Sequence, residues 1–400
     1  MKCLSALTFF LPILLASADA AEFEPWSYTG KDLFPSALIS TATMDWNGEE
    51  QAAEDKKTED DPDTDEDDVP LFGDENGWLG VTLYDLEAGS EVKVEIVIDG
   101  FLKASVWQGT IDDDLEEARI LPKALWDYAA LHEVRQQRPV NLVCKVSIDD
   151  EELPDQAETC IMKSINDCPF YVLWDEEGEE FDDLSFLFAA FVNENHPMVD
   201  TILKEALQSG MIDSFTGYQS GDPEVVIAQV FALWNALQRR GIKYSDVSTT
   251  TPSKYVVSQT VRFLDDSIGS TQANCVDGSV LMASLLRKIG IEPYLVMVPG
   301  HCFLAFDTGT DDDSELMALE TTMLGQDNLQ PITKLESMPA KILKKEFEAS
   351  FTTFSNAIET GNATLEENAD AIDSGESPDS QLISVTEART LGIMPIASTR

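Results

Sequence analysis

The hydrophobic pattern changes its period part-way along this 400-residue chain. Up to about position 165, short segments alternate apolar and polar residues, as strands with one buried face do. From Phe181 onward, apolar residues recur every three or four positions, which is the spacing of amphipathic helices. Strands followed by helices in this order are typical of the α+β class. We therefore expect two structural parts that meet near residue 170.

The first part, residues 21–170, is predicted to be an antiparallel β-sandwich of immunoglobulin-like type, because short strands follow one another at regular spacing. Asp99-Gly100 provides a hairpin turn between two of them. One segment, Leu115–Arg135, has helical spacing and interrupts the sandwich. The expected strands are Leu33–Trp46, Gly77–Tyr84, Glu91–Ile98, Ala104–Ile111, Val140–Ile148 and Glu158–Ile165.

The second part, residues 171–340, should begin with amphipathic helices and continue as a mixed α+β domain. A C-terminal helical and polar extension is expected over residues 341–400, with a polar stretch from Asn362 to Ser380. The expected helices outside the central one are Leu184–Val192, Val199–Leu207, Pro223–Arg240, a helix around Lys341–Thr360, and Ser384–Leu391.

Residues 1–20 have the composition of a secretory signal peptide: Lys2, then an apolar run, then Ala18-Asp19-Ala20 as a small-residue cleavage site. The apolar run is too short to cross a bilayer, and no later segment approaches 18 apolar residues. We therefore expect an exported protein, periplasmic or secreted, with no insertion into a membrane.

The chain is strongly acidic, with 74 acidic and 26 basic residues and a formal net charge of -48. This charge argues against nucleic acid as a partner, because phosphate backbones attract basic proteins. The most acidic run, within residues 47–69, lacks large apolar residues and is expected to be a disordered insertion in the sandwich. Asp61, Asp63 and Asp65 resemble the start of a calcium loop, but Glu66 and Phe72 stand where such a loop needs Gly and Glu, so no metal site is expected.

The segment after residue 272 carries the features expected of a thiol active site. Asn274 and Asp277 have the spacing of a capping box, which predicts a helix beginning at Cys275 and running to Lys288 or Ile289. Most of its positions are apolar, so this helix should be central and largely buried. Cys275 would lie at the positive end of the helix dipole, where the thiolate is favoured over the thiol.

Three apolar runs follow the helix and predict strands over Tyr294–Val298, His301–Phe306 and Leu316–Glu320. If Phe306 pairs with Glu315, the antiparallel register places His301 opposite Glu320, about 5 Å apart at Cβ. The other nearby acid, Asp307, would lie about 20 Å along the strand from His301. Glu320 is therefore the carboxylate expected to orient the imidazole.

These residues resemble the transglutaminase-like superfamily, which is related to papain-like cysteine peptidases. The similarity covers Cys-x-Asp-x-Ser at positions 275–279, Leu285-Leu286-Arg287 with Gly290-Ile291, Gly300-His301 with Phe303, and an acidic residue before Thr321-Thr322. The resemblance implies Cys275 as nucleophile, His301 as general base and Glu320 as the third member, where the family usually has Asp. It also implies a preceding sandwich, which is a common accompaniment in such proteins.

The expected chemistry is thiol-dependent acyl transfer on peptide or amide substrates, with the Cys275 backbone N–H and the Gln272 amide as oxyanion donors. Water as acceptor gives peptidase or amidase activity, whereas a lysine amine gives cross-linking. The alternative is a non-catalytic cell-envelope binding or scaffold protein with a degenerate core. No cofactor or metal is implied, and the oligomeric state is not readable from the sequence.

Loss of the leader with Cys3 leaves five cysteines, and an odd number favours one free thiol, for which Cys275 is the natural candidate. Cys302 should point to the face of its strand opposite His301, into the core. Cys144 lies on the strand before Cys160 and could pair with it, and Cys168 is the rival partner, so the connectivity stays open. Two further histidines, His132 and His196, are interpreted as structural.

Overall fold

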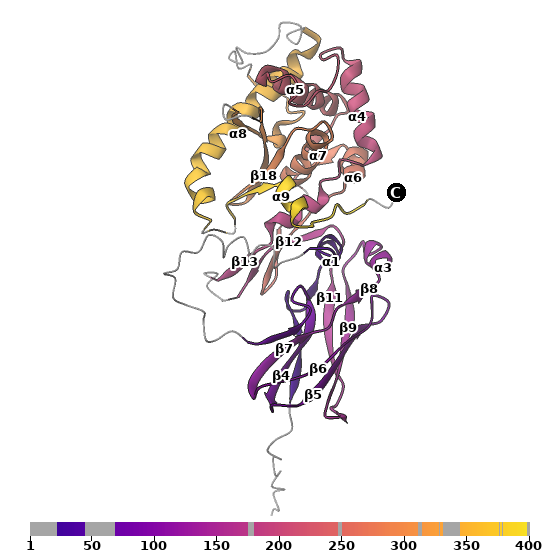
Figure 1. Ribbon diagram of the computed structural model, residues 1–400. Coiled ribbons are helices and arrows are strands. Elements are labelled where there is room, and N and C mark those ends of the chain that lie inside the picture. The colour runs from indigo at the N-terminus through magenta and orange to yellow at the C-terminus, as the bar shows by residue number, and fades with distance from the viewer. Residues whose placement is uncertain are drawn as a thin grey trace, which may run out of the picture.

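The computed structural model describes residues 22–44, 69–174, 180–246, 250–310, 314–327, 329–330, 345–375, 377 and 379–397. It has the α+β architecture expected from the change of period. The N-terminal strands form one end of an elongated molecule, and the helices gather around a separate sheet at the other end (Figure 1). The predicted leader and the acidic run lie outside the described residues.

Two sheets make up the N-terminal part. The first has the order β1-β4-β7-β3 and the second the order β2-β11-β9-β5-β6-β8, with β10 paired to β9. Neighbours pair antiparallel except β3 with β7 and β2 with β11, which pair parallel. The first sheet comprises β1 (Phe23–Ser27), β4 (Leu79–Leu86), β7 (Leu115–Leu121) and β3 (Leu71–Gly73). The second comprises β2 (Asp32–Leu33), β11 (Gln156–Met162), β9 (Arg138–Ile148), β5 (Glu91–Ile98), β6 (Leu102–Thr110), β8 (Leu125–Trp126) and β10 (Glu151–Glu152).

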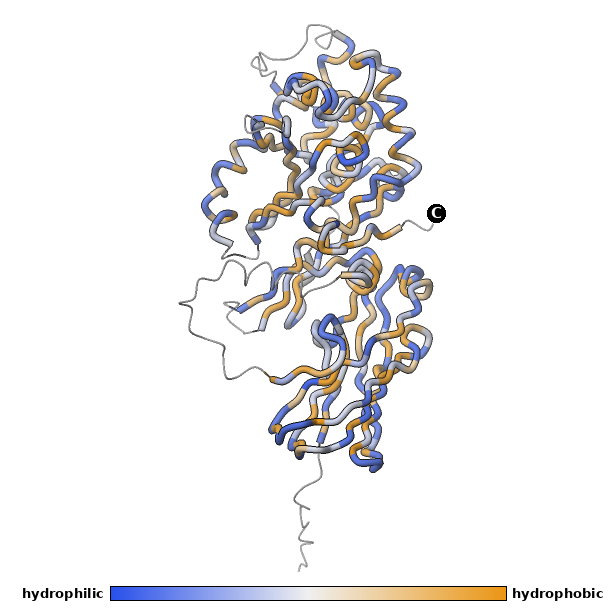
Figure 2. Tube along the Cα trace, in the orientation of Figure 1, coloured by the Kyte–Doolittle hydropathy of each residue, from blue (hydrophilic) through white to orange (hydrophobic). Residues whose placement is uncertain are grey.

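Alternation of apolar and polar residues holds these strands in register. In β5, Val92, Val94, Ile96 and Ile98 are buried while the residues between them are more exposed. A slip of one residue would turn this apolar face outward, so the pattern specifies the pairing with β6 and β9. The same alternation of blue and orange runs along the strands of this part in Figure 2. Gly100, at a φ of 78°, makes the predicted turn into β6.

The expected strand over Leu33–Trp46 is wrong over residues 34–44, and its last two residues lie outside the described ranges. After β2 the chain forms α1 (Pro35–Ser40), with Pro35 in the first turn. Proline is well suited to that position because its missing N–H would have no partner there. The helix is almost wholly buried and packs against β12 (Asp167–Leu173) and η1 (Ser185–Phe191) of the second part. Ser36 donates to the Asp167 carbonyl at 2.5 Å. The helix therefore ties the two parts together.

The helix expected over Leu115–Arg135 is also wrong. Its first seven residues form β7, which lies between β4 and β3. Pro122 follows β7, and only α3 (Tyr128–His132) is helical. The apolar residues of β7 alternate weakly, so their spacing is compatible with a helix and with a strand. The segment forms a strand because it pairs with neighbours on both sides.

A third sheet of order β13-β12-β16-β15 lies between the N-terminal part and the helices (Figure 1). None of its strands was predicted. Because β12 begins before position 170 and pairs with β16 from far along the chain, the expected boundary falls inside one strand. The strands are β12 (Asp167–Leu173), β13 (Phe181–Asp183), β15 (Thr250–Pro252) and β16 (Val256–Thr260).

The C-terminal part surrounds α7 (Cys275–Lys288), which is buried along most of its length. A sheet of order β20-β19-β18-β21 packs against it, and α7 contacts both β18 and β19. The strands are β18 (Pro293–Val298), β19 (His301–Asp307), β20 (Leu316–Leu319) and β21 (Gln381–Ser384), with a separate parallel pair β14 (Lys243–Tyr244) and β17 (Gln272–Ala273). The helices are η1 (Ser185–Phe191), α4 (Pro197–Gln208), α5 (Pro223–Arg239), α6 (Leu264–Ser270), η2 (Thr321–Met323), η3 (Lys345–Phe347), α8 (Glu348–Ser374) and α9 (Val385–Thr390).

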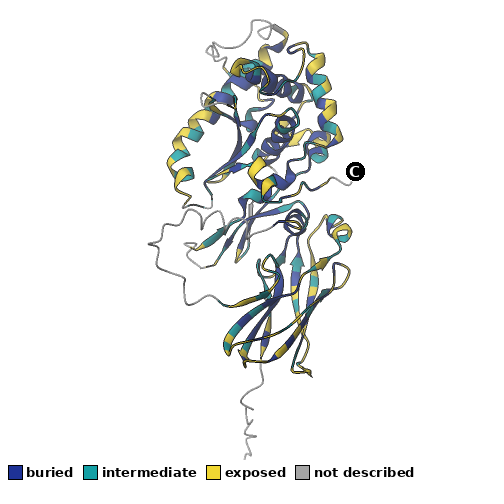
Figure 3. Cartoon of the chain, viewed as in Figure 1, coloured by how far each residue is buried: buried dark blue, intermediate teal, exposed yellow. Residues whose placement is uncertain are grey.

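The polar stretch expected from Asn362 is helical as far as Ser374, because α8 continues through it. Figure 3 shows α8 exposed along its outer side, and its buried residues all lie between Ser350 and Gly361. Gly361 permits close packing on β20: a Cβ there would lie 2.8 Å from the backbone carbon of Ala318 in that strand. The Asn362 side chain accepts from the Ala318 N–H at 2.8 Å and so satisfies a backbone group at this sheet edge.

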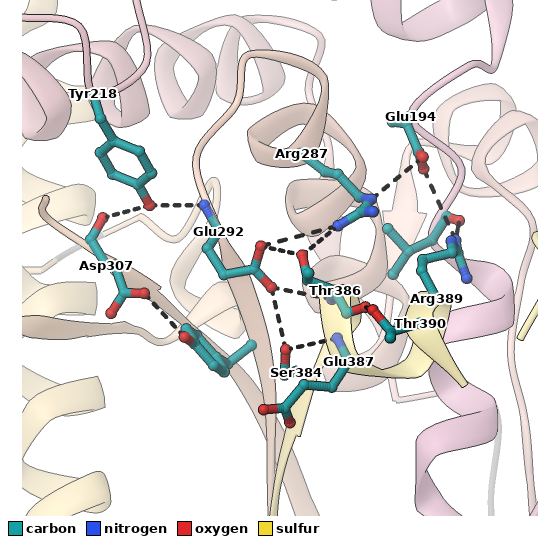
Figure 4. A network of polar contacts seen from close by, with 12 residues as sticks. Glu194, Tyr218, Arg287, Glu292, Asp307, Ser384, Thr386, Glu387, Arg389 and Thr390 are labelled. Carbon is teal, nitrogen blue, oxygen red and sulfur yellow. Dashed lines mark hydrogen bonds and ion pairs between the residues drawn. The ribbon is translucent and has the colours of Figure 1, made fainter. Parts of the chain in front are cut away.

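The last described segment completes the sheet instead of extending away from it. β21 pairs antiparallel with β18, and α9 follows directly. Figure 4 shows the polar contacts that fix this segment to the end of α7. Arg287 donates to Thr386 at 2.8 Å and to Glu194 at 3.3 Å, while Glu292 accepts from the Thr386 N–H at 3.1 Å and from Ser384 at 3.3 Å. None of the helices in the described ranges combines the length and apolar character needed to cross a membrane.

Candidate active site

Cys275 is the first residue of α7, as the capping box predicts. The Asn274 side chain accepts from the Asp277 N–H at 2.8 Å, and the Asp277 carboxylate accepts from the Asn274 N–H at 3.0 Å. Asp277 is fully buried and is also held by Arg262, whose backbone N–H and guanidinium donate to it at 2.7 and 2.8 Å. Burial raises the Asp277 pKa, and these hydrogen bonds oppose the rise. The start of the helix, and with it the thiol, is thereby fixed.

His301 is the first residue of β19, opposite Val298 across the β18–β19 turn. Gly300, at a φ of 71°, makes that turn. The ring stacks on Phe303 with a centroid separation of 6.1 Å. Its Nε2 lies 2.6 Å from Glu320 Oε2, and the ring also forms a hydrogen bond with the Cys275 side chain. One imidazole therefore contacts the thiol and the carboxylate together, and Nδ1 is the nitrogen left for the thiol.

The contact of His301 with Glu320 is reached by a different register from the one expected. Phe306 pairs with Met317, not with Glu315, so the strand is shifted by two residues and the same faces stay together. Glu320 follows β20 and caps η2, where it accepts from the Thr322 N–H at 3.0 Å and from the Thr322 hydroxyl at 2.6 Å. His301 at one carboxylate oxygen and Thr322 at the other therefore hold Glu320 in place.

Asp307, the rejected alternative, lies at the far end of β19. It accepts from the Tyr294 hydroxyl at 2.9 Å, and its carbonyl accepts from Tyr218 at 3.2 Å (Figure 4). The preference for Glu320 over Asp307 as the partner of the ring therefore agrees with the structure.

His301 and Glu320 each shift the pKa of the other. Hydrogen bonds with Cys275 and then Glu320 raise the pKa of His301 to about 10, against the opposing effect of burial. For Glu320, burial by itself raises the pKa, but hydrogen bonding and charge attraction from His301, with help from Thr322, bring the pKa below its ordinary value. At neutral pH the pair is therefore an imidazolium beside a carboxylate.

The thiol and the ring open onto a cleft of about 210 Å³. The β18–β19 turn forms one wall and β12 with β16 the other, so the third sheet contributes directly to the site. Glu320 is only 6% exposed and lies behind the ring. Besides Cys275 and His301, the lining residues are Phe170, Tyr171, Val257, Gln259, Val276, Met297, Val298, Gly300, Cys302 and Asp379.

Several residues around the site were not predicted. Gln259 and Asp379 line the cleft, but the strand carrying Gln259 gave no clear alternating signal, and Asp379 lay in a segment interpreted as polar coil. Thr322, which orients Glu320, belongs to the Thr-Thr pair that follows the acidic residue of the motif. It is the one residue of this group that the motif could have indicated. Gln272 lies on β17 and is exposed. Tyr244 lies on the paired strand β14, and its pKa is raised by burial and by the nearby Cys275 and Glu320.

The remaining cysteines and histidines have other environments. Cys144 and Cys160 are buried free thiols, and their strands pair with Cys144 opposite Gln156 and Cys160 opposite Val140, so the suggested pairing is not formed. Cys168 and Cys302 are also buried and free. His196 caps α4 by accepting from the Met198 N–H at 3.2 Å, and burial lowers the pKa of His132.

In the described residues, no group of three or more His, Cys, Asp and Glu side chains is arranged to hold a metal ion. Comparisons with protein-family models, with curated proteins and with solved structures give no match. Function is therefore inferred from the geometry of Cys275, His301 and Glu320 and from the cleft before them.

Proposed function

We propose that this protein catalyses thiol-dependent acyl transfer on peptide or amide substrates, as a peptidase or amidase or as a transglutaminase-like enzyme. The observation that carries the proposal is the position of His301, hydrogen-bonded to Cys275 on one side and to Glu320 on the other. A nucleophile, a base and a group that orients the base form the minimum set for covalent acyl transfer.

In the proposed reaction, the Cys275 thiolate, whose proton is held by His301, attacks the substrate carbonyl carbon and the C=O π electrons move onto oxygen. His301 then transfers its proton to the leaving amine as the C–N bond breaks, which gives a thioester. His301 next takes a proton from water, and the resulting hydroxide attacks the thioester and releases an acid and the thiolate. If a lysine amine attacks in place of water, the product is a new amide.

The oxyanion donors proposed are the Cys275 backbone N–H, at the start of α7, and the Gln272 amide. A helix N-terminus suits this role because its first N–H groups have no partner within the helix. Gln272 lies two residues before the helix cap and is exposed, so its amide is free to turn toward a bound carbonyl. We further propose that the N-terminal sheets are an immunoglobulin-like sandwich, that the remainder is a transglutaminase-like domain, and that the protein is exported.

The test compares the mature protein with Cys275→Ala and His301→Ala on unfolded polypeptide substrates. Cleavage is measured by mass spectrometry of the products, and amine transfer by incorporation of a fluorescent primary amine into protein. Both reactions should fall by a factor of 1,000 or more in either variant, on the order of the loss seen when a triad member is removed. His132→Ala is the matched control, since it removes a half-buried histidine of the N-terminal part.

Wild-type protein that binds these polypeptides but neither cleaves them nor attaches an amine would contradict the proposal. The same result would favour a cell-envelope binding or scaffold protein whose core is inactive. Activity that survives in Cys275→Ala would exclude the thiol mechanism even if the protein is an enzyme.

A further inference from the structure

A larger cavity, of about 770 Å³, lies at the junction between the N-terminal part and α6, on the side of the molecule where α3 and α6 appear in Figure 1. It is lined from three distant segments: residues 135–137 after α3, residues 163–167 between β11 and β12, and residues 258–270 of β16 and α6. Ser258 and Thr260 face this cavity while Gln259, between them on β16, lines the thiol cleft. The two hollows are therefore on opposite faces of one strand.

The charge of this cavity differs from that of the whole chain. Arg135, Lys163 and Arg262 line it, against two carboxylates, Asp167 and Asp266. The chain as a whole has almost three acidic residues for every basic one. Both Asp167 oxygens are turned to neighbours, since they accept from the Ser164 N–H at 3.1 Å and from the Thr260 hydroxyl at 2.8 Å. The lining is thus richer in cationic side chains than the chain as a whole, and two of its three cations, Lys163 and Arg262, also pair with the carboxylates of Asp32 and Asp277.

Lys163 contributes a mostly buried ammonium, which lies over the Phe34 ring at 5.8 Å from its centroid. Its side chain is only 10% exposed, and its ammonium pairs with Asp32 at 3.6 Å, a distance too long for a hydrogen bond. An ammonium has three donors, and burying it is costly unless these are satisfied. Arg262 directs one nitrogen at the buried Asp277 and remains 22% exposed, so further guanidinium donors are available at the cavity it lines.

We infer that this cavity is a binding site for an oxyanion group, a carboxylate or a phosphate, carried by a polar molecule. Lys163 and Arg262 would supply the charge from within, and Arg135 would close over the group from the rim, where it is exposed. The side-chain amides of Gln136 and Gln137, both exposed, provide further donors around it. This inference does not depend on the proposed reaction at Cys275.

The test is isothermal titration of inorganic phosphate, and separately of succinate, into the full mature chain bearing Cys275→Ser, so that catalysis plays no part. About 0.15 M salt screens the long-range repulsion from the net negative charge. Saturable binding is expected for at least one of the two anions, and the preferred anion identifies the source of the group. Lys163→Met and Arg135→Gln should each weaken that affinity about tenfold, since hydrogen bonds to charged groups are worth roughly that factor.

Lys145→Gln is the matched control, because it removes an exposed lysine paired with Glu95 at 2.8 Å and should leave the affinity unchanged. Arg135 is exposed, so its variant reports on binding even if Lys163→Met folds poorly. Absence of saturable binding of either anion up to roughly 20 mM would overturn the inference. An equal loss of affinity in Lys145→Gln would overturn it too, since binding would then follow net charge and not the cavity.

Discussion

Replacing Glu320 by Gln should lower the pKa of His301 markedly. The two groups lie 2.6 Å apart, and the His301 side chain is 31% exposed. A charge pair about 4 Å apart at an effective dielectric constant near 20 is worth about 4 kcal/mol, or about 3 pKa units. Allowing for the partial exposure of the ring, we expect the pKa of His301 to fall by about 2 from its value of about 10. Gln keeps the shape of the side chain and removes its charge.

The assay is an NMR titration of the histidine rings, which is simple because the chain has three histidines. In the wild type, the His301 signal should stay that of an imidazolium from pH 5 to 8.5, while His132, whose pKa is lowered by burial, becomes neutral early in that range. In Glu320→Gln, His301 should titrate near pH 8. An ordinary titration of wild-type His301 near pH 6.5 would refute the charged pair, and an unchanged titration in the variant would refute the role of Glu320.

The same variant makes a prediction about stability, whose sign follows from the direction of the shift. A histidine with a raised folded-state pKa contributes stability that is complete below its unfolded-state value of about 6.5 and is lost as the pH rises through its folded-state value of about 10. Glu320→Gln should therefore lower the urea midpoint more at pH 6 than at pH 10. An equal decrease of the urea midpoint at pH 6 and pH 10 would show that the variant loses stability through packing and not through charge.

Two further predictions concern the thiol and the packing of α8. Iodoacetamide should label native Cys275 while the buried Cys302 stays unmodified, as read by mass spectrometry. His301→Ala should slow the labelling of Cys275 about tenfold at pH 6. Labelling that appears only on unfolding would contradict this prediction. Gly361→Ala should destabilise the fold by about 1–3 kcal/mol in urea unfolding because its Cβ would meet the β20 backbone. Gly269→Ala in α6, where nothing lies within 4 Å, is the control and should be neutral or stabilising.

The parts of the site that could be predicted are those specified by local sequence. Asn274 and Asp277 set the start of α7 through contacts three residues apart, so the position of Cys275 needed no tertiary information. The pairing of His301 with Glu320 depended on side-chain alternation, which survives a register shift of two residues. The predicted face of β19 was therefore right and its predicted register with β20 was wrong. The apolar pattern of two strands does not determine the length of the loop between them.

The parts that could not be predicted depend on neighbours far along the chain. β16 pairs with β12 almost 90 positions earlier and has no clear alternation, since four of its five residues are buried. Segments buried on both faces have no periodic signal to distinguish strand from helix. For α1 the reverse error occurred: small residues alternated as in a strand, but nearly the whole segment is buried against β12, α3 and η1, which allowed a helix. The wall of the cleft formed by β12 and β16 was therefore not predicted, whereas the side that carries Cys275 and His301 was.

Arg262 links the larger cavity to the start of the helix that carries Cys275. Its backbone N–H and guanidinium both hold Asp277, which in turn accepts from the residue that caps the helix of Cys275. A fully buried carboxylate needs such donors, because an unpaired charge at that depth would be far costlier than the pair. The guanidinium lines the larger cavity at the same time, so an anion there and Asp277 share one cation. If a bound anion changes the free energy of the arrangement around Cys275, that arrangement must change the free energy of anion binding by the same amount.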